Sequence, residues 1–309
     1  MKKIFAAILM MCLVLVGGCG SQQSQQKKTL DIGLMPDTDS LPFIIAREKG
    51  YFDEEGVKVE LHSFKSAMDR DSALQSGNLD GAVSDVLAVA FAKSGGFAVK
   101  ITSASDGSYQ VIAGKSEPGA DIKALAGKDV AVSRNTIIEY VTDRILEKEG
   151  MAEDSINKVV IPQIPNRLEM LQNGKIAAAT LPEPMAGIAI HNGCHFLTSS
   201  DQLGINPGVI MFTEKSLEEK KESVLAMYRA YNKAVKYLNE APRAEYIDLV
   251  VEKAGFPSGS QESLKIPHYH EAAIPKESDV TECIQWLREK SLLLEEYTYG
   301  NLVENLFAK

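Results

Sequence analysis

Two stretches of this chain, about 100 residues apart, follow the same order of polar and apolar segments. The stretch that begins at Leu74 (LQSGNLDGAVSDVLAVAFAKSGG) and the stretch that begins at Leu171 (LQNGKIAAATLPEPMAGIAIHNG) coincide at Leu-Gln-x-Gly and at the closing glycine. A stacked solenoid needs three or more such units, and only two are present. The pattern therefore predicts two lobes built on one plan. The alternative is a chance similarity of two strand–helix units.

Short strand-like runs alternate with helix-like segments through both stretches. The strands are expected at 29–35, 57–64, 82–83, 99–103, 130–132 and 158–161. The helices between them are expected at 41–49, 66–76, 85–93, 135–149 and 166–173, each closed by a glycine. This alternation predicts an α/β fold in which each lobe is a mostly parallel sheet flanked by helices. Later helices, which we expect to pack back on the first lobe, are predicted at 216–239, 243–254, 279–290 and 300–307.

The chain is expected to cross between the lobes at two hinges, near residues 109–115 and 208–213. The first lobe then comprises residues 29–108 and 209–309, with the C-terminal helices, and the second comprises residues 109–208. The roughly 280 residues involved are enough for two lobes of ordinary domain size. A hydrophobic content of 45% and a charged content of 24% are typical of a globular protein.

The N-terminus has the layout of a secretory signal. Two lysines precede an apolar run over residues 4–16, which is too short to span about 30 Å of hydrocarbon. The run ends in Gly-Gly-Cys19, which resembles the lipobox of bacterial lipoproteins. We therefore expect a signal peptide at 1–18, lipidation of Cys19, a flexible tether at 19–28, and a lipid-anchored protein on the extracytoplasmic face of the cell membrane. The alternative is an ordinary signal peptide with an incidental cysteine.

The charge balance excludes some partners. The formal net charge is −9, and removal of the signal with its two lysines makes it −11. An acidic chain without a basic stripe is a poor candidate for binding nucleic acid, and it has no polybasic run for anionic lipid. No later stretch is apolar enough for a transmembrane helix. The lipid on Cys19 is the expected membrane contact.

Two cysteines remain in the predicted mature domain, Cys194 and Cys283. They have no CxxC spacing and no histidine at zinc-site intervals. Export permits a disulfide between them, but the two are expected to fall in different lobes. Two buried free thiols are therefore favoured.

Polar loops follow the predicted strands. In open α/β sheets, ligands bind outside the carboxyl ends of the strands, where helix N-termini present free N–H groups. Loops rich in Ser, Thr, Asp and Asn occur at 36–40, 65–68, 84–85, 133–136 and 182–184. Capping alone would explain Ser40, Ser66 and Asp85. Five such loops in two lobes favour a shared cleft.

Three segments resemble a known family. They are 34–52 (LMPDTDSLPFIIAREKGYF), 77–85 (GNLDGAVSD) and Glu183-Pro184, and the resemblance to the periplasmic-binding-protein-like family for nitrate, taurine, aliphatic sulfonates and thiamine precursors covers residues 29–309. It implies a type 2, two-lobe fold that closes on a small organic solute and delivers it to an ABC permease with its ATPase. By position it implies a ligand site formed by Asp37, Thr38, Asp39, Ser40, Ser66, Ala67, Ser84, Asp85, Ser133, Asn135, Thr136 and Glu183.

The predicted cleft departs from the family in one loop. Many thiamine-precursor binders place a Trp or Tyr there, whereas this chain has Pro-Asp-Thr-Asp at 36–39. Four of the implied site residues are acidic, and Arg134 is the one cation expected nearby. A bare anion would meet unfavourable charge unless helix N-termini outweigh it. Donor-rich or zwitterionic solutes fit better.

An enzyme on the same two-lobe fold, of the dehydratase or pyrimidine-synthase type, is the main alternative. None of the five histidines lies in a nucleophile motif, and no dinucleotide or P-loop motif occurs. His268 and His270, with Glu271, could suggest a metal, but a surface loop is favoured. We therefore expect a monomeric binding protein without catalytic residues, cofactor or metal. A solute that bridges both lobes is expected to favour their closure.

Overall fold

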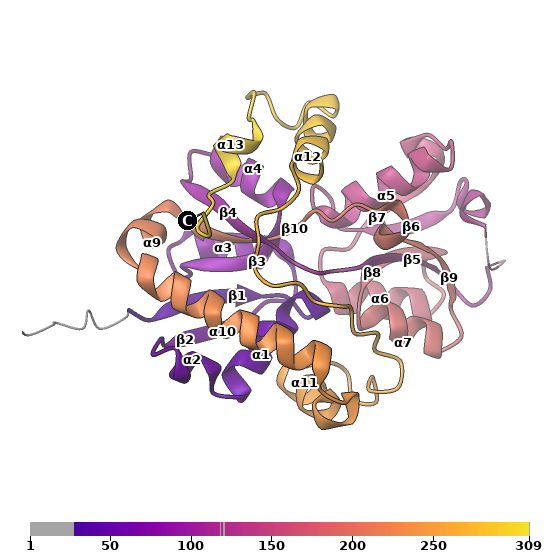
Figure 1. Cartoon of the computed structure of the whole chain (residues 1–309). Coiled ribbons are helices and arrows are strands. Elements are labelled where there is room, and N and C mark those ends of the chain that lie inside the picture. Colours follow the sequence, from indigo (N-terminus) through magenta and orange to yellow (C-terminus); the bar gives the residue numbers. More distant parts are fainter. Residues whose placement is uncertain (1–27, 118, 120, 309) are drawn as a thin grey trace, which may run out of the picture.

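The computed structural model of the chain describes residues 28–117, 119 and 121–308 (Figure 1). The predicted signal peptide, Cys19 and the tether up to residue 27 lie outside the described residues. Within the described part, every helix is too short or too polar to cross a membrane.

The first sheet contains five strands in the order β2-β1-β3-β10-β4. β1 pairs in parallel with β2 and β3, whereas β10 is antiparallel to β3 and to β4. Four strands therefore share one direction and β10 opposes them. Their bounds are Leu30–Leu34 (β1), Val59–Ser63 (β2), Gly81–Asp85 (β3), Val99–Ala104 (β4) and Gly208–Thr213 (β10).

The second sheet repeats this plan in the order β7-β6-β8-β5-β9. β6 is parallel to β7 and β8, and β5 is antiparallel to β8 and β9. The prediction of two similar lobes is thus confirmed, and each sheet has one reversed strand. The bounds are Tyr109–Ala113 (β5), Asp129–Val132 (β6), Asn157–Val160 (β7), Ala178–Pro182 (β8) and His195–Ser199 (β9).

Helices flank both sheets. Those of the first are Leu41–Glu48 (α1), Tyr51–Glu54 (α2), Ala67–Gln75 (α3), Val86–Ser94 (α4) and Glu214–Glu219 (α9). Those of the second are Ile137–Lys148 (α5), Ile164–Gln172 (α6), Met185–His191 (α7) and Ser200–Leu203 (α8). The helix predicted from residue 135 begins two residues later. Asn135 has a left-handed backbone (φ 57°), and Thr136 caps α5 by accepting a bond from the Ile138 N–H at 3.2 Å.

The C-terminal helices are Lys221–Glu240 (α10), Ile247–Lys253 (α11), Glu277–Glu289 (α12) and Tyr299–Leu302 (α13). α10 and α11 pack against α1, as expected for a return to the first lobe (Figure 1). α12 packs against α4 but also reaches the second lobe, where the rings of Trp286 and Tyr140 meet edge to face at 5.6 Å. α12 therefore packs on the first lobe as expected, and its contact with the second lobe was not expected. The helix predicted to residue 307 ends at Leu302, because Val303 pairs with Ile101 beside β4.

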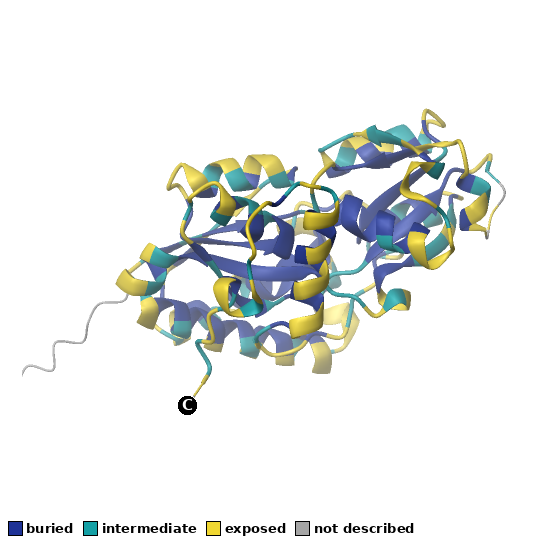
Figure 2. Cartoon of the chain, turned by 90° about the horizontal axis from the view of Figure 1, so that it is seen from above, coloured by how far each residue is buried: buried dark blue, intermediate teal, exposed yellow. Residues whose placement is uncertain are grey.

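The strands and the inner faces of the helices are buried, and the outer helix faces are exposed (Figure 2). One apolar cluster is shared by the two lobes, since it joins Leu87 of α4, Tyr140 of α5 and Trp286 of α12. Cys194 and Cys283 are both buried and both free, as predicted.

Candidate functional site

A cavity lies between the two sheets, where the segments after β1, β2, β3, β6 and β7 meet. Its empty volume is about 460 Å³, part of which is open to solvent. Residues of both lobes line it, so a molecule bound there would contact both. The edge of the cavity is closed by a hydrogen bond between lobes, from the Ile164 N–H to the Lys65 carbonyl at 3.1 Å.

Seven of the twelve implied ligand residues line this cavity. Four loops supply them, which agrees with the expectation that polar loops at the strand ends share one cleft. The seven are Asp37, Asp39, Ala67, Ser84, Asp85, Ser133 and Thr136. Asp85 also caps α4 by accepting a bond from the Ala88 N–H at 2.9 Å.

Four of the other five implied residues have local roles or face elsewhere. Ser66 caps α3, where its Oγ accepts a bond from the Asp69 N–H at 3.2 Å. Ser40 does not cap α1, because its hydroxyl bonds back to the end of β1, donating to the Met35 carbonyl at 2.8 Å. Thr38 is buried outside the cavity lining, and Asn135 is exposed.

Glu183 lies in a second, more open depression that Thr38 and Lys265 also line. The Gln110 side-chain amide donates to Glu183 Oε1 at 2.8 Å, and the Gly187 N–H donates to Oε2 at 3.2 Å. Burial raises the pKa of Glu183. Its contacts tie the start of α7 to β5, which is a structural role outside the cavity.

The loop after β1 adds two buried carboxylates to that of Asp85 on the first-lobe wall. Asp37 is 5% exposed and Asp39 is 2% exposed. The Tyr109 hydroxyl donates to Asp39 Oδ2 at 3.2 Å, while Oδ1 is buried without a hydrogen-bond partner among the described residues. A Cβ at Gly107 would lie 2.0 Å from Oδ2, so only glycine lets the backbone approach this carboxylate. Burial raises the pKa of Asp39 to about 6 and holds that of Asp37 well above its ordinary value.

Two arginines that were not predicted from the sequence line the cavity. Arg70 of α3 is 3% exposed, and its guanidinium lies 2.8 Å from Asp71 Oδ1 and 4.0 Å from Asp85 Oδ2. Arg134, expected as the nearby cation, is exposed and is not among the lining residues. The flanking Asp69 and Asp71 made this part of α3 resemble a solvated helix face, which hid the signal.

Arg167, in the first turn of α6, is the second buried arginine, and it is 1% exposed. Its Nη1 donates to the carbonyls of Ile161 at 2.9 Å and Pro162 at 3.1 Å. Its Nε and Nη2 have no hydrogen-bond partner in the described part of the chain. Burial lowers the pKa of Arg167 to about 9. Nothing in the segment IPNRLEML distinguishes this arginine from a surface residue.

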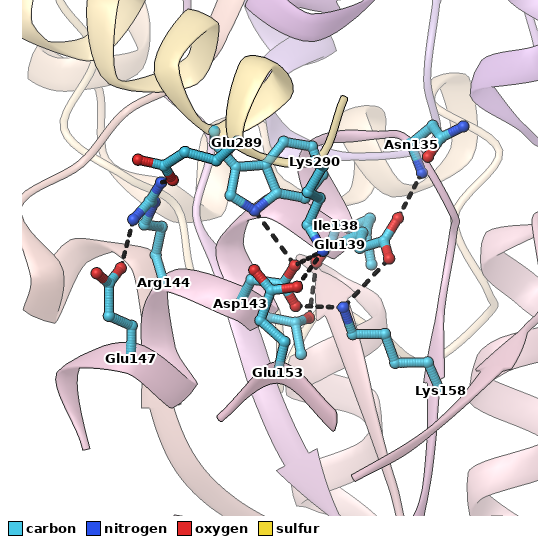
Figure 3. A network of polar contacts seen from close by, with 12 residues as sticks. Asn135, Ile138, Glu139, Asp143, Arg144, Glu147, Glu153, Lys158, Glu289 and Lys290 are labelled. Carbon is cyan, nitrogen blue, oxygen red and sulfur yellow. Dashed lines mark hydrogen bonds and ion pairs between the residues drawn. The ribbon is translucent and has the colours of Figure 1, made fainter. Parts of the chain in front are cut away.

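A network of charged residues is hydrogen-bonded to the loop at 133–136 (Figure 3). The Asn135 N–H donates to Glu139 Oε2 at 2.7 Å, and Lys158 bonds Glu139 Oε1 at 3.2 Å. Lys158 also pairs with Asp143. Asp143 Oδ2 in turn lies 3.2 Å from Trp286 Nε1 and 2.9 Å from Lys290 Nζ, both of the α12 region. The position of this cavity loop is thus linked to the C-terminal segment.

This fold is that of periplasmic solute-binding proteins. The alkanesulfonate-binding protein SsuA from Xanthomonas axonopodis pv. citri, solved with MOPS bound, is similar with a TM-score of 0.77 at 16% identity, over 90% of this chain and 98% of that one. A family model described as NMT1/THI5 like matches residues 37–245, and the chain belongs to this family.

Two curated relatives are similar along most of the chain. A protein of Bacillus subtilis (strain 168) that is named as an aliphatic sulfonates-binding protein is 24% identical over 75% of this chain and 73% of its own length. A protein of Brachyspira hyodysenteriae named as an ABC transporter periplasmic binding protein is 24% identical over 78% of this chain and 75% of its own length.

Proposed function

We propose that this protein is a solute-binding protein that captures a small organic solute between its lobes and delivers it to an ABC importer. The observation that carries this proposal is the cavity between the sheets, which brings charged and hydroxyl groups from both lobes to one place. Ligand sites at such strand ends are the rule for open α/β sheets. The names of the two curated relatives support the same class of function.

Binding is expected to depend on the relative position of the lobes, taken as residues 29–108 with 209–309 and residues 109–208. A solute that contacts both walls binds the closed arrangement better, and only such a difference in affinity can shift the equilibrium toward closure. The permease, driven by its ATPase, would then receive the solute from the closed form. Within this proposal, the seven cavity residues named above bind the solute.

The anchor is proposed from the sequence. Cys19 would carry the lipid, residues 19–28 would act as the tether, and the domain would lie on the extracytoplasmic face of the cell membrane as a monomer. Mass spectrometry of the mature protein checks this directly. A lipid mass on an N-terminal Cys19 is expected, and an unmodified N-terminus would contradict the anchor.

Binding without catalysis is favoured over an enzyme of the dehydratase or pyrimidine-synthase type. No histidine or cysteine is among the described residues that line the cavity. His270, which the sequence placed in a possible metal cluster, has its Nδ1 2.7 Å from Asp106 Oδ1, and its ring lies 5.4 Å from that of His268. The lining offers fixed charges and hydroxyls, which suit recognition.

A solute screen on the purified domain, residues 29–309, tests the function. The library includes taurine, alkyl sulfonates, amino-pyrimidines, flavins and amino acids. A solute at about 100 times its dissociation constant adds roughly 2.7 kcal/mol to the free energy of unfolding, so a true ligand raises Tm by several degrees. Calorimetry should then show one site per chain. A folded domain that binds no solute of any class would contradict the proposal.

A further inference from the structure

The second-lobe wall of the cavity holds a cation with unused donors. The Nε–H and one Nη2–H of a guanidinium lie parallel along one edge, which is the fork that binds two oxygens of an oxyanion at once. In Arg167 this edge is the one without partners, while Nη1 is held by the Ile161 and Pro162 carbonyls. The two carbonyls fix the guanidinium in place, so that its free edge is preorganised.

No counterion balances this arginine. Arg167 forms no ion pair within the described part of the chain, although it is 1% exposed. Arg70, the other arginine of the lining, is already paired with Asp71 and lies near Asp85. A buried charge without a partner is strongly unfavourable, and a structure that keeps one has a place for an opposite charge.

The first-lobe wall has buried oxygen atoms that lack hydrogen-bond partners among the described residues. Asp39 Oδ1 is buried without a hydrogen bond among the described residues, and so is Ser84 Oγ. The donors that act on Asp39 are neutral hydroxyls: Tyr109 donates to Oδ2 at 3.2 Å, and the neighbouring Ser105 hydroxyl lowers the pKa of this carboxyl. No cation contacts this carboxylate in the described ranges. Unpartnered acceptors on one wall and unpartnered donors on the other indicate a ligand with two different ends.

We propose that Arg167 anchors an oxyanion of the solute, a carboxylate or a sulfonate, while Asp39 accepts an amino group at the other end. The solute class is then a small amino acid or amino sulfonate, held between the lobes by one charge from each. This assignment rests on the proposed function and narrows it. The raised pKa of Asp39 agrees with it, because an ammonium group beside this carboxylate would restore its charged form.

The test uses matched probes on residues 29–309. β-Alanine and taurine carry both ends, propionate and ethanesulfonate carry only the oxyanion, and ethylamine carries only the amine. Calorimetry should show at least one two-ended probe binding roughly tenfold or more tighter than each one-ended probe. A one-ended oxyanion that binds as tightly as its two-ended counterpart would overturn the role of Asp39.

The variant Arg167→Lys tests the contribution of the two parallel guanidinium donors to binding. Lysine keeps the charge and can still donate to the Ile161 and Pro162 carbonyls, but it cannot present two parallel donors. We expect the affinity for the two-ended probe to fall roughly 10- to 100-fold, with an unchanged Tm in the absence of ligand. Arg134→Lys, the same change at an exposed position, should alter the affinity less than about twofold.

The outcomes separate the two proposals. Unchanged affinity in Arg167→Lys would remove Arg167 from the site. If all five probes fail while the wider screen yields a solute without an oxyanion, the ligand class is wrong and the solute-binding function stands. If a folded domain binds nothing in either set, the function itself is contradicted.

Discussion

The buried carboxyl of Asp39 makes the free energy of unfolding of the domain depend on pH. Its pKa is raised from an ordinary value of 3.8 to about 6, chiefly by burial. Between these values the folded state binds more protons than the unfolded state, so the free energy of unfolding falls as pH rises from about 4 to about 6. A shift of this size corresponds to a loss on the order of 2–3 kcal/mol. Asp37 acts in the same direction.

Asp39→Asn should therefore raise the free energy of unfolding at pH 7 by about 2 kcal/mol and weaken solute binding. Urea unfolding of the ligand-free domain at pH 4 and pH 7 measures the first effect, with exposed Asp154→Asn as the control. The variant should show a smaller loss of stability between the two pH values than the wild type. An equal loss in both would mean that Asp39 is not the titrating group.

Single site residues were predictable only where local sequence carries the signal. Asp85 and Thr136 follow strands and precede apolar helices, so their place at a helix N-terminus could be read from the chain. Arg70 and Arg167 could not be found this way. Their guanidinium groups are held by tertiary contacts, Arg70 with the Val83 carbonyl and Arg167 with the Ile161 and Pro162 carbonyls. A charged residue on a helix otherwise predicts a solvated face.

α12 acts as a brace between the lobes. It packs on α4, and Trp286 contacts both the Tyr140 ring and Asp143 of α5. Trp286→Phe keeps an aromatic ring but removes the donor to Asp143. The free energy of unfolding should fall by about 2 kcal/mol, since a hydrogen bond to a charged group and part of a buried ring are lost.

Urea unfolding checks this prediction, with Gln285→Ala on the exposed face of α12 as the control, which should change stability by less than about 0.5 kcal/mol. Solute affinity should also fall modestly in Trp286→Phe, because Asp143 is linked through Lys158 and Glu139 to the cavity loop. Stability equal to that of the wild type would show that α12 does not brace the lobes.

Elements were predicted best where a glycine closes the helix. α1, before Gly50, and α3, before Gly77, begin and end within one residue of their expected bounds. β9 was not expected, since its sequence HFLTS is short and half polar. The segments of β5 and β10 were expected only as crossings between the lobes, so their pairing and their reversed direction were missed. A short apolar run gives no direction, which is set by long-range pairing with β8 and β3.

The two-lobe architecture of the molecule corresponds to the repeat in the sequence. Two units of one plan fold into two sheets with the same strand order, and their loops meet at one cavity. The sequence predicted this arrangement because repeated strand–helix order constrains topology strongly. It could not predict which charges the cavity would enclose, because that depends on how one lobe meets the other.

We propose that this cavity holds the transported solute, and a crystal structure of the domain with a solute found in the screen tests this proposal. We expect the solute to lie between the two sheets, in contact with residues of both lobes, Asp39 and Arg167 among them. A solute bound in the depression beside Glu183, or on the surface of one lobe, would contradict it.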